Sequence, residues 1–278
     1  MKARKRAQKD QRVHLRLIKN KAPLLVGLLL SFSCDFTSGL NREILVAQDY
    51  VESQNYEKAA ETYERLLKQN PAKLVRTKIH YQLAEIYYLY LNQQTRALVH
   101  YKYIVDNDDD PRNQVRSLEK IADINFNFSK NYPEAIRAYG TLLKFHPRLQ
   151  NADYYDFKVA ESYFENNELN KADLLFSKIA LNTNHQNHVE AFYYQGLIRF
   201  YQQNWDAAVE RWLQYIKREK RKDIIVKTKF LIANAYESGE KLKEAYNIYY
   251  SLLDDHPNPA MIRDRLKALY ARRVARKR

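Results

Sequence analysis

The chain contains few of the residues that interrupt helices or cross-link small domains. Its 278 residues include only 5 Gly, 7 Pro and 1 Cys. A single cysteine cannot form an internal disulfide, so a fold held together by such bonds is excluded. Proline and glycine cluster toward the ends of the periodic segments. The long stretches between them can form uninterrupted helices, and the composition therefore predicts an all-helical protein.

Residues that carry catalytic chemistry are present but lack a usable arrangement. The sequence has no glycine-rich phosphate-binding loop, and its seven histidines are scattered. His185 and His188 lie three residues apart, but no thiolate or suitably placed carboxylate accompanies them, so polar loop residues explain them better than a metal site. The acidic run from Asp106 to Pro111 has proline where a calcium-binding loop requires glycine. We expect no enzymatic activity, no cofactor and no bound metal.

What the chain does contain is a repeat of small and aromatic residues. Six alanines recur at intervals of 36 to 38 residues, and an aromatic residue follows each of them four positions later. These pairs are Ala59 and Tyr63, Ala97 and Tyr101, Ala135 and Tyr139, Ala172 and Phe176, Ala208 and Trp212, and Ala245 and Tyr249. A second small residue precedes each pair: Ala47, Ala84, Ala122, Ala160, Gly196 and Ala233. Residues four apart share a helix face, and small residues let helices approach closely, so the pattern predicts stacked helical hairpins.

The clearest unit, from Ala47 to Pro71, resembles a tetratricopeptide repeat. Ala47 and Tyr50 stand at the small and aromatic sites of the first helix, Ala59 and Tyr63 at those of the second, and Pro71 at the closing proline. The resemblance implies a right-handed α-solenoid of about six such hairpins with a C-terminal capping helix. We expect the hairpins at about 40–71, 74–111, 115–147, 153–183, 189–220 and 224–257, within an array that spans 40–257.

The amino terminus has the features of an export signal. Residues 1–21 contain nine Lys or Arg and one acidic residue, and the uncharged run APLLVGLLLSFS follows. A run of about a dozen residues is too short to span a bilayer. The only cysteine, Cys34, follows directly, and Leu30–Cys34 resembles the cleavage box of bacterial lipoproteins, whose cysteine becomes lipidated. We expect a signal peptide at 1–33, lipidation of Cys34 and a short tether at 34–39. Cleavage without lipidation and an uncleaved anchor are the alternatives.

The formal charge of +14 is concentrated at the two ends of the chain. Residues 263–278 contain eight Lys or Arg and one acid, which leaves the repeats between the two basic ends nearly neutral. We therefore expect no nucleic-acid binding by the repeats. In the last segment, 258–278, a capping helix is expected as far as Tyr270. Beyond it, Ala271 to Arg278 is expected to form a frayed basic extension that contacts an anionic surface.

The resemblance also implies a binding groove. In tetratricopeptide repeats the fifth, ninth and twelfth positions of each first helix face a bound ligand. Most of the fifth and twelfth positions here are aromatic, and they supply the candidate groove residues Tyr81, Tyr88, Phe126, Phe157, Phe164, Tyr193, Phe200 and Phe230. Glu85, Asp123 and Glu161 occupy three of the ninth positions. This set predicts a site for an apolar helix or extended peptide with basic flanking residues. Packing of the rings between neighbouring hairpins is the alternative.

The function expected from these features is a non-enzymatic scaffold that binds another protein of the bacterial cell envelope. Tetratricopeptide lipoproteins of this size resemble accessory subunits of outer-membrane barrel assembly, of type IV pilus secretin assembly and of cell-wall synthesis, and we favour the first. We expect a periplasmic, membrane-anchored lipoprotein of the outer membrane, although Asp35 after the cysteine also suits retention in the inner membrane. The alternative function is a module that binds an envelope or cell-wall surface through the basic tail.

Overall fold

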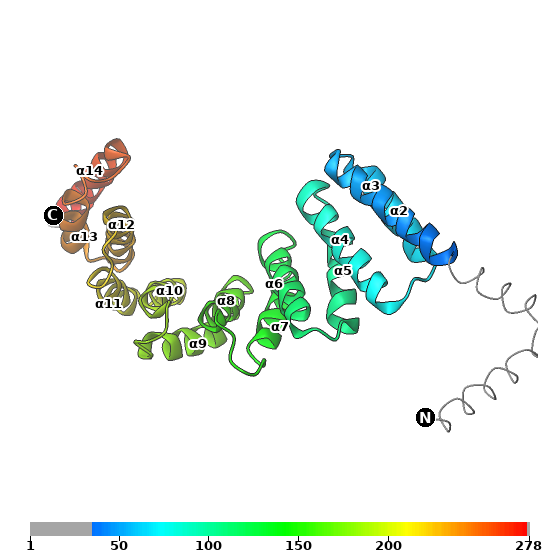
Figure 1. Ribbon diagram of the computed structural model, residues 1–278. Helices are drawn as coiled ribbons and strands as arrows, with labels where there is room; N and C mark the ends of the chain where they lie inside the picture. Colours follow the sequence, from blue (N-terminus) through cyan, green and yellow to red (C-terminus); the bar gives the residue numbers. More distant parts are fainter. Residues whose placement is uncertain (1–34, 277–278) are drawn as a thin grey trace, which may run out of the picture. The chain divides into compact units, whose positions relative to one another are not determined.

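The computed structural model describes residues 35–276 and divides them into two compact units, 35–93 and 94–276 (Figure 1). The expected signal peptide and Cys34 lie outside the described residues. Within those residues the chain forms helices and no strand, and consecutive helices pack as hairpins. The prediction of an all-helical repeat fold is thereby confirmed.

Unit 1 contains the first hairpin and the helix that follows it. Helices α2 (Asp35–Glu52) and α3 (Tyr56–Lys68) pack together, and α4 (Lys73–Glu85) continues into the π-helical turn η1 (Ile86–Tyr90). The boundary between the units falls after Gln93, inside the second expected hairpin.

Unit 2 begins with a single helix, continues through four hairpins and ends with one further helix. The first is α5 (Gln94–Asn107). The hairpins pair α6 (Pro111–Asn127) with α7 (Tyr132–Leu142), α8 (Ala152–Glu165) with α9 (Leu169–Leu181), α10 (His188–Tyr201) with α11 (Trp205–Ile216), and α12 (Lys222–Ser238) with α13 (Leu242–Tyr250). The last helix is α14 (Pro259–Ala275), which packs on α13.

The small and aromatic residues of the repeat form the core. All eleven alanines of the pattern are fully buried, and Gly196 lies among them in the fifth repeat. The aromatic residues that follow four positions later, from Tyr63 to Tyr249, are at most 2% exposed. A methyl group or a hydrogen at the crossing point allows the backbones to approach, and the aromatic ring fills the adjacent space. The spacing of these residues therefore determines where the helices cross.

The turns inside the hairpins share one backbone conformation. Gln54, Lys130 and Gln203 have positive φ angles of 60°, 51° and 59°. The asparagine after each of them caps the second helix, because its side chain accepts a hydrogen bond from a backbone N–H of the first turn. The asparagine cap, repeated at Asn55, Asn131 and Asn204, thus starts α3, α7 and α11 at equivalent places.

An additional residue between the helices of the second and third repeats is absorbed by a wider turn. In unit 1 the N–H of Leu91 donates to the carbonyl of Ile86 at 3.1 Å, five residues earlier, and closes η1. In unit 2 the N–H of Ser129 makes the equivalent bond to Ile124 at 3.0 Å. A local π-type turn accommodates one inserted residue without shifting the helices on either side.

Both ends of the described chain are more helical than expected. Helix α2 already begins at Asp35, so the segment expected as a tether overlaps the first turns of a helix. At the other end α14 continues to Ala275, five residues beyond Tyr270. The expectation of a frayed extension from Ala271 was therefore wrong for most of that segment. Ion pairs from Arg272 and Arg276 to α12 and its following turn stabilise this last part of α14. None of the helices within 35–276 combines the length and hydropathy required to cross a membrane.

Candidate partner-binding face

In unit 2 the hairpins follow one another in a row, and the two helices of each hairpin lie on different sides of that row. Figure 1 shows α6, α8, α10 and α12 along one side, and α7, α9, α11 and α13 along the other. We call the side formed by α6, α8, α10 and α12 the first-helix face. Six of the eight predicted groove residues belong to these helices, whereas Tyr81 on α4 and Tyr88 on η1 belong to unit 1 and are half-buried there.

Two of the predicted groove residues are core residues. Phe126 and Phe157 are only 8% and 9% exposed. The ring of Phe157 lies with its centroid 5.6 Å from that of Phe176 on α9 and 5.5 Å from that of Tyr194 on α10, which closes it off between two hairpins. The burial of these two residues favours the alternative of packing between neighbouring hairpins, because side chains of the next hairpin cover positions that are open on an isolated repeat.

A lysine covers Phe126. The ammonium group of Lys158, on α8, lies 3.5 Å from the centroid of the Phe126 ring. The same ammonium forms an ion pair of 2.8 Å with Glu161, one turn along α8. A cation is therefore held between an aromatic ring and a carboxylate on this face, an arrangement that is favourable because both groups attract positive charge.

The remaining predicted residues of unit 2 are half-buried and contact other aromatic residues. Phe164 contacts Tyr194 and Tyr201, Tyr193 contacts Tyr215, Phe200 contacts Trp205 and Trp212, and Phe230 contacts Tyr249. Each ring thus packs inward on one edge and reaches the surface on another. The structure brings them together in pairs and small clusters, and their role as ligand contacts stays a prediction.

Two exposed tyrosines of the first helices were missed by the sequence analysis. Tyr201 at the end of α10 is 61% exposed, and its ring lies beside that of Phe164 with centroids 5.8 Å apart. Tyr154 at the start of α8 is 40% exposed. Tyr201 directly follows the predicted Phe200, and one residue further along a helix turns the side chain by about 100° toward solvent. The position of Tyr201 directly after Phe200 was the feature of the sequence that could have identified it.

Tyrosine hydroxyls and carboxylates connect successive first helices. The Tyr155 hydroxyl on α8 donates to Glu119 on α6, and the Tyr194 hydroxyl on α10 donates to Glu161 on α8 at 2.6 Å. Asp123 on α6 accepts from Tyr139 on α7 at 2.6 Å. These bonds tie α6, α7, α8 and α10 together at half-buried polar positions, where an unsatisfied carboxylate would be costly.

The tyrosines in these pairs remain neutral donors. Burial raises the pKa of Tyr139, Tyr155 and Tyr194 well above its ordinary value, and the neighbouring carboxylate raises it further. A neutral hydroxyl donates a hydrogen bond without cancelling the charge of the carboxylate that accepts it. Glu161 has Lys158 as a counter-charge, but Glu119 and Asp123 form no ion pair with any residue in the described range.

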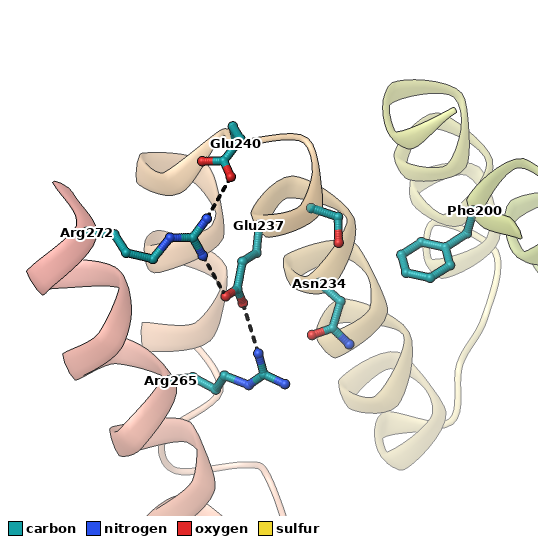
Figure 2. A pocket seen from close by; sticks show the side chains of 7 residues that line it. Phe200, Asn234, Glu237, Glu240, Arg265 and Arg272 are labelled. Carbon is teal, nitrogen blue, oxygen red and sulfur yellow. Dashed lines mark hydrogen bonds and ion pairs between the residues drawn. The ribbon is translucent and has the colours of Figure 1, made fainter. Parts of the chain in front are cut away.

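At the C-terminal end of this face, α14 contributes a set of arginines. A hollow of about 370 Å³ is lined by Phe200, Asn234, Glu237, Ser238, Glu240, Arg265 and Arg272. Arg272 bridges Glu237 at 3.1 Å and Glu240 at 2.8 Å, and Arg265 reaches Glu237 at 3.4 Å. Figure 2 shows Arg272 between the two carboxylates, with Phe200 facing Asn234 from α10.

No metal site is formed by the described residues. Within 35–276 no three His, Cys, Asp or Glu side chains converge as metal ligands would. His185 is buried, although it lies in a loop. Its Nδ1 accepts a hydrogen bond from the backbone N–H of Asn187 at 3.1 Å. The backbone N–H of Gln186, between these two residues, donates to Asp153 at 2.8 Å. These bonds fasten the loop before α10 to the start of α8, which is a structural role.

Comparisons with known proteins agree with this architecture. Two models of the tetratricopeptide repeat match residues 46–110 and 190–219. A comparison with curated proteins finds no match. The structure is similar to the C-terminal part of a repeat-containing protein of this type from Cytophaga hutchinsonii, with a TM-score of 0.58 and 18% identity over 82% of this chain and 87% of that chain.

Two further solved structures have the same kind of fold. PilW, a widely conserved type IV pilus biogenesis factor, gives a TM-score of 0.50 and 14% identity over 83% of this chain and 98% of that chain. The structure of Naa15 and Naa10 bound to HypK gives a TM-score of 0.52 and 16% sequence identity, over 84% of this chain and 39% of that chain. At these identities the likeness concerns the fold alone. The matched segments and the hairpins together show that this chain contains tetratricopeptide repeats.

Proposed function

We propose that this protein is a non-enzymatic scaffold that binds a helix or peptide of a partner protein on the first-helix face of unit 2. The observation that carries the proposal is the composition of this face between α6 and α10. It exposes the rings of Tyr201 on α10 and Tyr154 on α8, and the Tyr154 hydroxyl lies 3.5 Å from Asp123. Asp123 and Glu119 have no counter-charge among the described residues. Exposed aromatic rings next to half-buried polar groups are typical of sites where protein partners are bound.

We place this scaffold in the bacterial cell envelope. The basic and apolar segments before Cys34 support export, and a lipid on Cys34 would anchor the array to a membrane, the outer membrane in our proposal. PilW offers a precedent for this fold in pilus biogenesis. Among envelope processes we favour assembly of outer-membrane proteins, with this chain as an accessory subunit.

The alternative of a module that binds an anionic surface through the basic tail has less support. Arg265, Arg272 and Arg276 are already paired with Glu237 and Glu240. Two cations of the tail, Arg272 and Arg276, and Arg265 just before it are thereby paired within the protein, which reduces the charge available to an external surface.

Fractionation and capture of the Cys34→Ser variant test the envelope proposal. The wild-type protein is expected in the membrane fraction, whereas the variant is expected in the soluble fraction or unprocessed, because the thiol that would carry the lipid is lost. Ser33→Ala is the matched control, since alanine also suits the small position before the cysteine. Unchanged membrane association of Cys34→Ser would contradict the anchor. Failure of the solubilised wild-type chain to capture any envelope protein would contradict the scaffold.

A further inference from the structure

The chain itself contains an example of a basic helix bound to a first helix. Arg265 and Arg272 of α14, and Arg276 directly after its end, are seven and four residues apart and therefore share one helix face. All three form ion pairs with Glu237 at the end of α12 or with Glu240 in the turn that follows it. Figure 2 shows those of Arg265 and Arg272. Carboxylates of the repeat are thus able to hold the arginines of a helix that lies beside them.

A second pair of carboxylates lies half-buried on α6. Glu119 and Asp123 are four residues apart, so they stack on one face of the helix. Glu119 accepts the hydroxyl of Tyr155, and Asp123 accepts those of Tyr139 and Tyr154. A carboxylate can accept several hydrogen bonds, so each retains acceptor capacity after the hydroxyl is bound. In the part of the chain that the structure describes, no Lys, Arg or His forms an ion pair with either residue.

The neighbouring residues of α8 show that this region accepts a cation. Lys158 is held there by the Phe126 ring and by Glu161. The side chain of Lys158 is 12% exposed and that of Glu161 is 16% exposed, so the pair is shielded from water. Electrostatic attraction at such partly shielded positions is stronger than between fully solvated charges. A second cation arriving at Glu119 and Asp123 would find two negative charges and no competing cation paired with them.

We infer that the partner segment bound on α6 and α8 is a basic helix, whose arginine or lysine side chains pair with Glu119 and Asp123 as those of α14 pair with Glu237 and Glu240. This inference rests on the proposed function and specifies the chemistry of the partner. Charge complementarity sets the selectivity, since an acidic helix would bring like charges together. A second copy of this chain is a poor source of that helix, because Arg265, Arg272 and Arg276, which share one face at its C-terminal end, are already paired.

A peptide titration tests the inference directly. The probe is a fluorescent alanine-based helical peptide with arginines at three positions spaced as in α14, and its counterpart has glutamates at the same positions. The arginine peptide is expected to bind the mature chain, and the double variant Glu119→Gln and Asp123→Asn is expected to weaken binding at least tenfold. Amides still accept the hydroxyls of Tyr155 and Tyr139, so circular dichroism of the variant is expected to match the wild type.

The matched control changes the same amount of charge elsewhere. Glu210→Gln with Glu244→Gln removes two exposed carboxylates from the second helices α11 and α13 and is expected to leave binding unchanged. Equal affinity of the arginine peptide for the two double variants, or equal binding of the glutamate peptide, would overturn the inference, as would a wild-type dimer that Glu119→Gln and Asp123→Asn dissociates. The scaffold proposal is judged separately by capture of an envelope protein, which would persist if the partner were not basic.

Discussion

Replacing Gly196 with alanine is expected to destabilise the protein by roughly 2–4 kcal/mol, the combined cost of overpacking and of a lost buried hydrogen bond. A Cβ atom at this position would lie 2.3 Å from Nε1 and 2.4 Å from Cδ1 of Trp212. The indole cannot move away easily, because Trp212 is fully buried and its Nε1 donates to the carbonyl of Tyr193 at 3.1 Å.

Gly140→Ala is the matched control for this prediction. Gly140 lies inside α7, and a Cβ there would meet no atom within 4 Å. Alanine is the better helix former by about 1 kcal/mol, so this variant is expected to be slightly more stable than the wild type. Urea unfolding followed by circular dichroism measures both changes. Equal stabilities of the two variants would show that α10 and α11 do not cross at Gly196.

Truncation of Phe157 is the second change with a large expected effect. Because its ring is enclosed by Phe176 and Tyr194, Phe157→Ala is expected to cost about 3–5 kcal/mol of unfolding free energy through loss of burial and the cavity left behind. Tyr201→Ala removes a ring that is 61% exposed and is expected to cost less than about 1 kcal/mol. Thermal unfolding of the two variants side by side distinguishes core from surface.

The reverse order of stabilities would change the assignment of the face. If Phe157→Ala unfolded at the wild-type temperature and lost its partner, Phe157 would be a contact residue, as the sequence pattern first indicated. If Tyr201→Ala were the less stable variant, Tyr201 would have to be part of the core and could not be an open contact.

The sequence was sufficient to place the helices because only small residues fit where two helices cross. Ala135 and Ala160 are fully buried, and Gly196 leaves space for the side chain of Trp212, so a larger residue at these positions would push the helices apart. That requirement is local and periodic, so it is visible without the structure. The asparagine caps have the same character, since each satisfies backbone groups within its own turn.

The candidate site was less predictable because it depends on neighbouring hairpins. Burial of Phe126 requires Lys158, which lies on the next first helix, and burial of Phe157 requires Tyr194 on the one after. The length of α14 depends on ion pairs such as that between Arg276 and Glu240, which are 36 residues apart. The sequence pattern of one repeat does not indicate which of its aromatic residues will be buried by the following repeat.

The tyrosine and carboxylate pairs were partly within reach of the sequence. Asp123 and Glu161 stood out as acidic residues at equivalent positions, and Tyr139 as the aromatic residue of the same repeat as Asp123. The hydrogen-bond donor to Glu161 could not be predicted from the sequence. Its own repeat carries Phe176, which has no hydroxyl, so Tyr194 of the next repeat donates instead while its ring stacks on Phe176 with centroids 4.7 Å apart.

Site-specific photo-crosslinking in cells tests most directly whether the first-helix face is the surface that binds the partner. Benzoylphenylalanine would replace Tyr201, which is exposed at the end of α10, or Leu213, which is 46% exposed on α11 among the second helices. Both sites accept a large side chain at the surface. We predict a protein adduct from position 201 and none from position 213. Adducts from position 213 alone, or equal adducts from both positions, would contradict binding on the first-helix face.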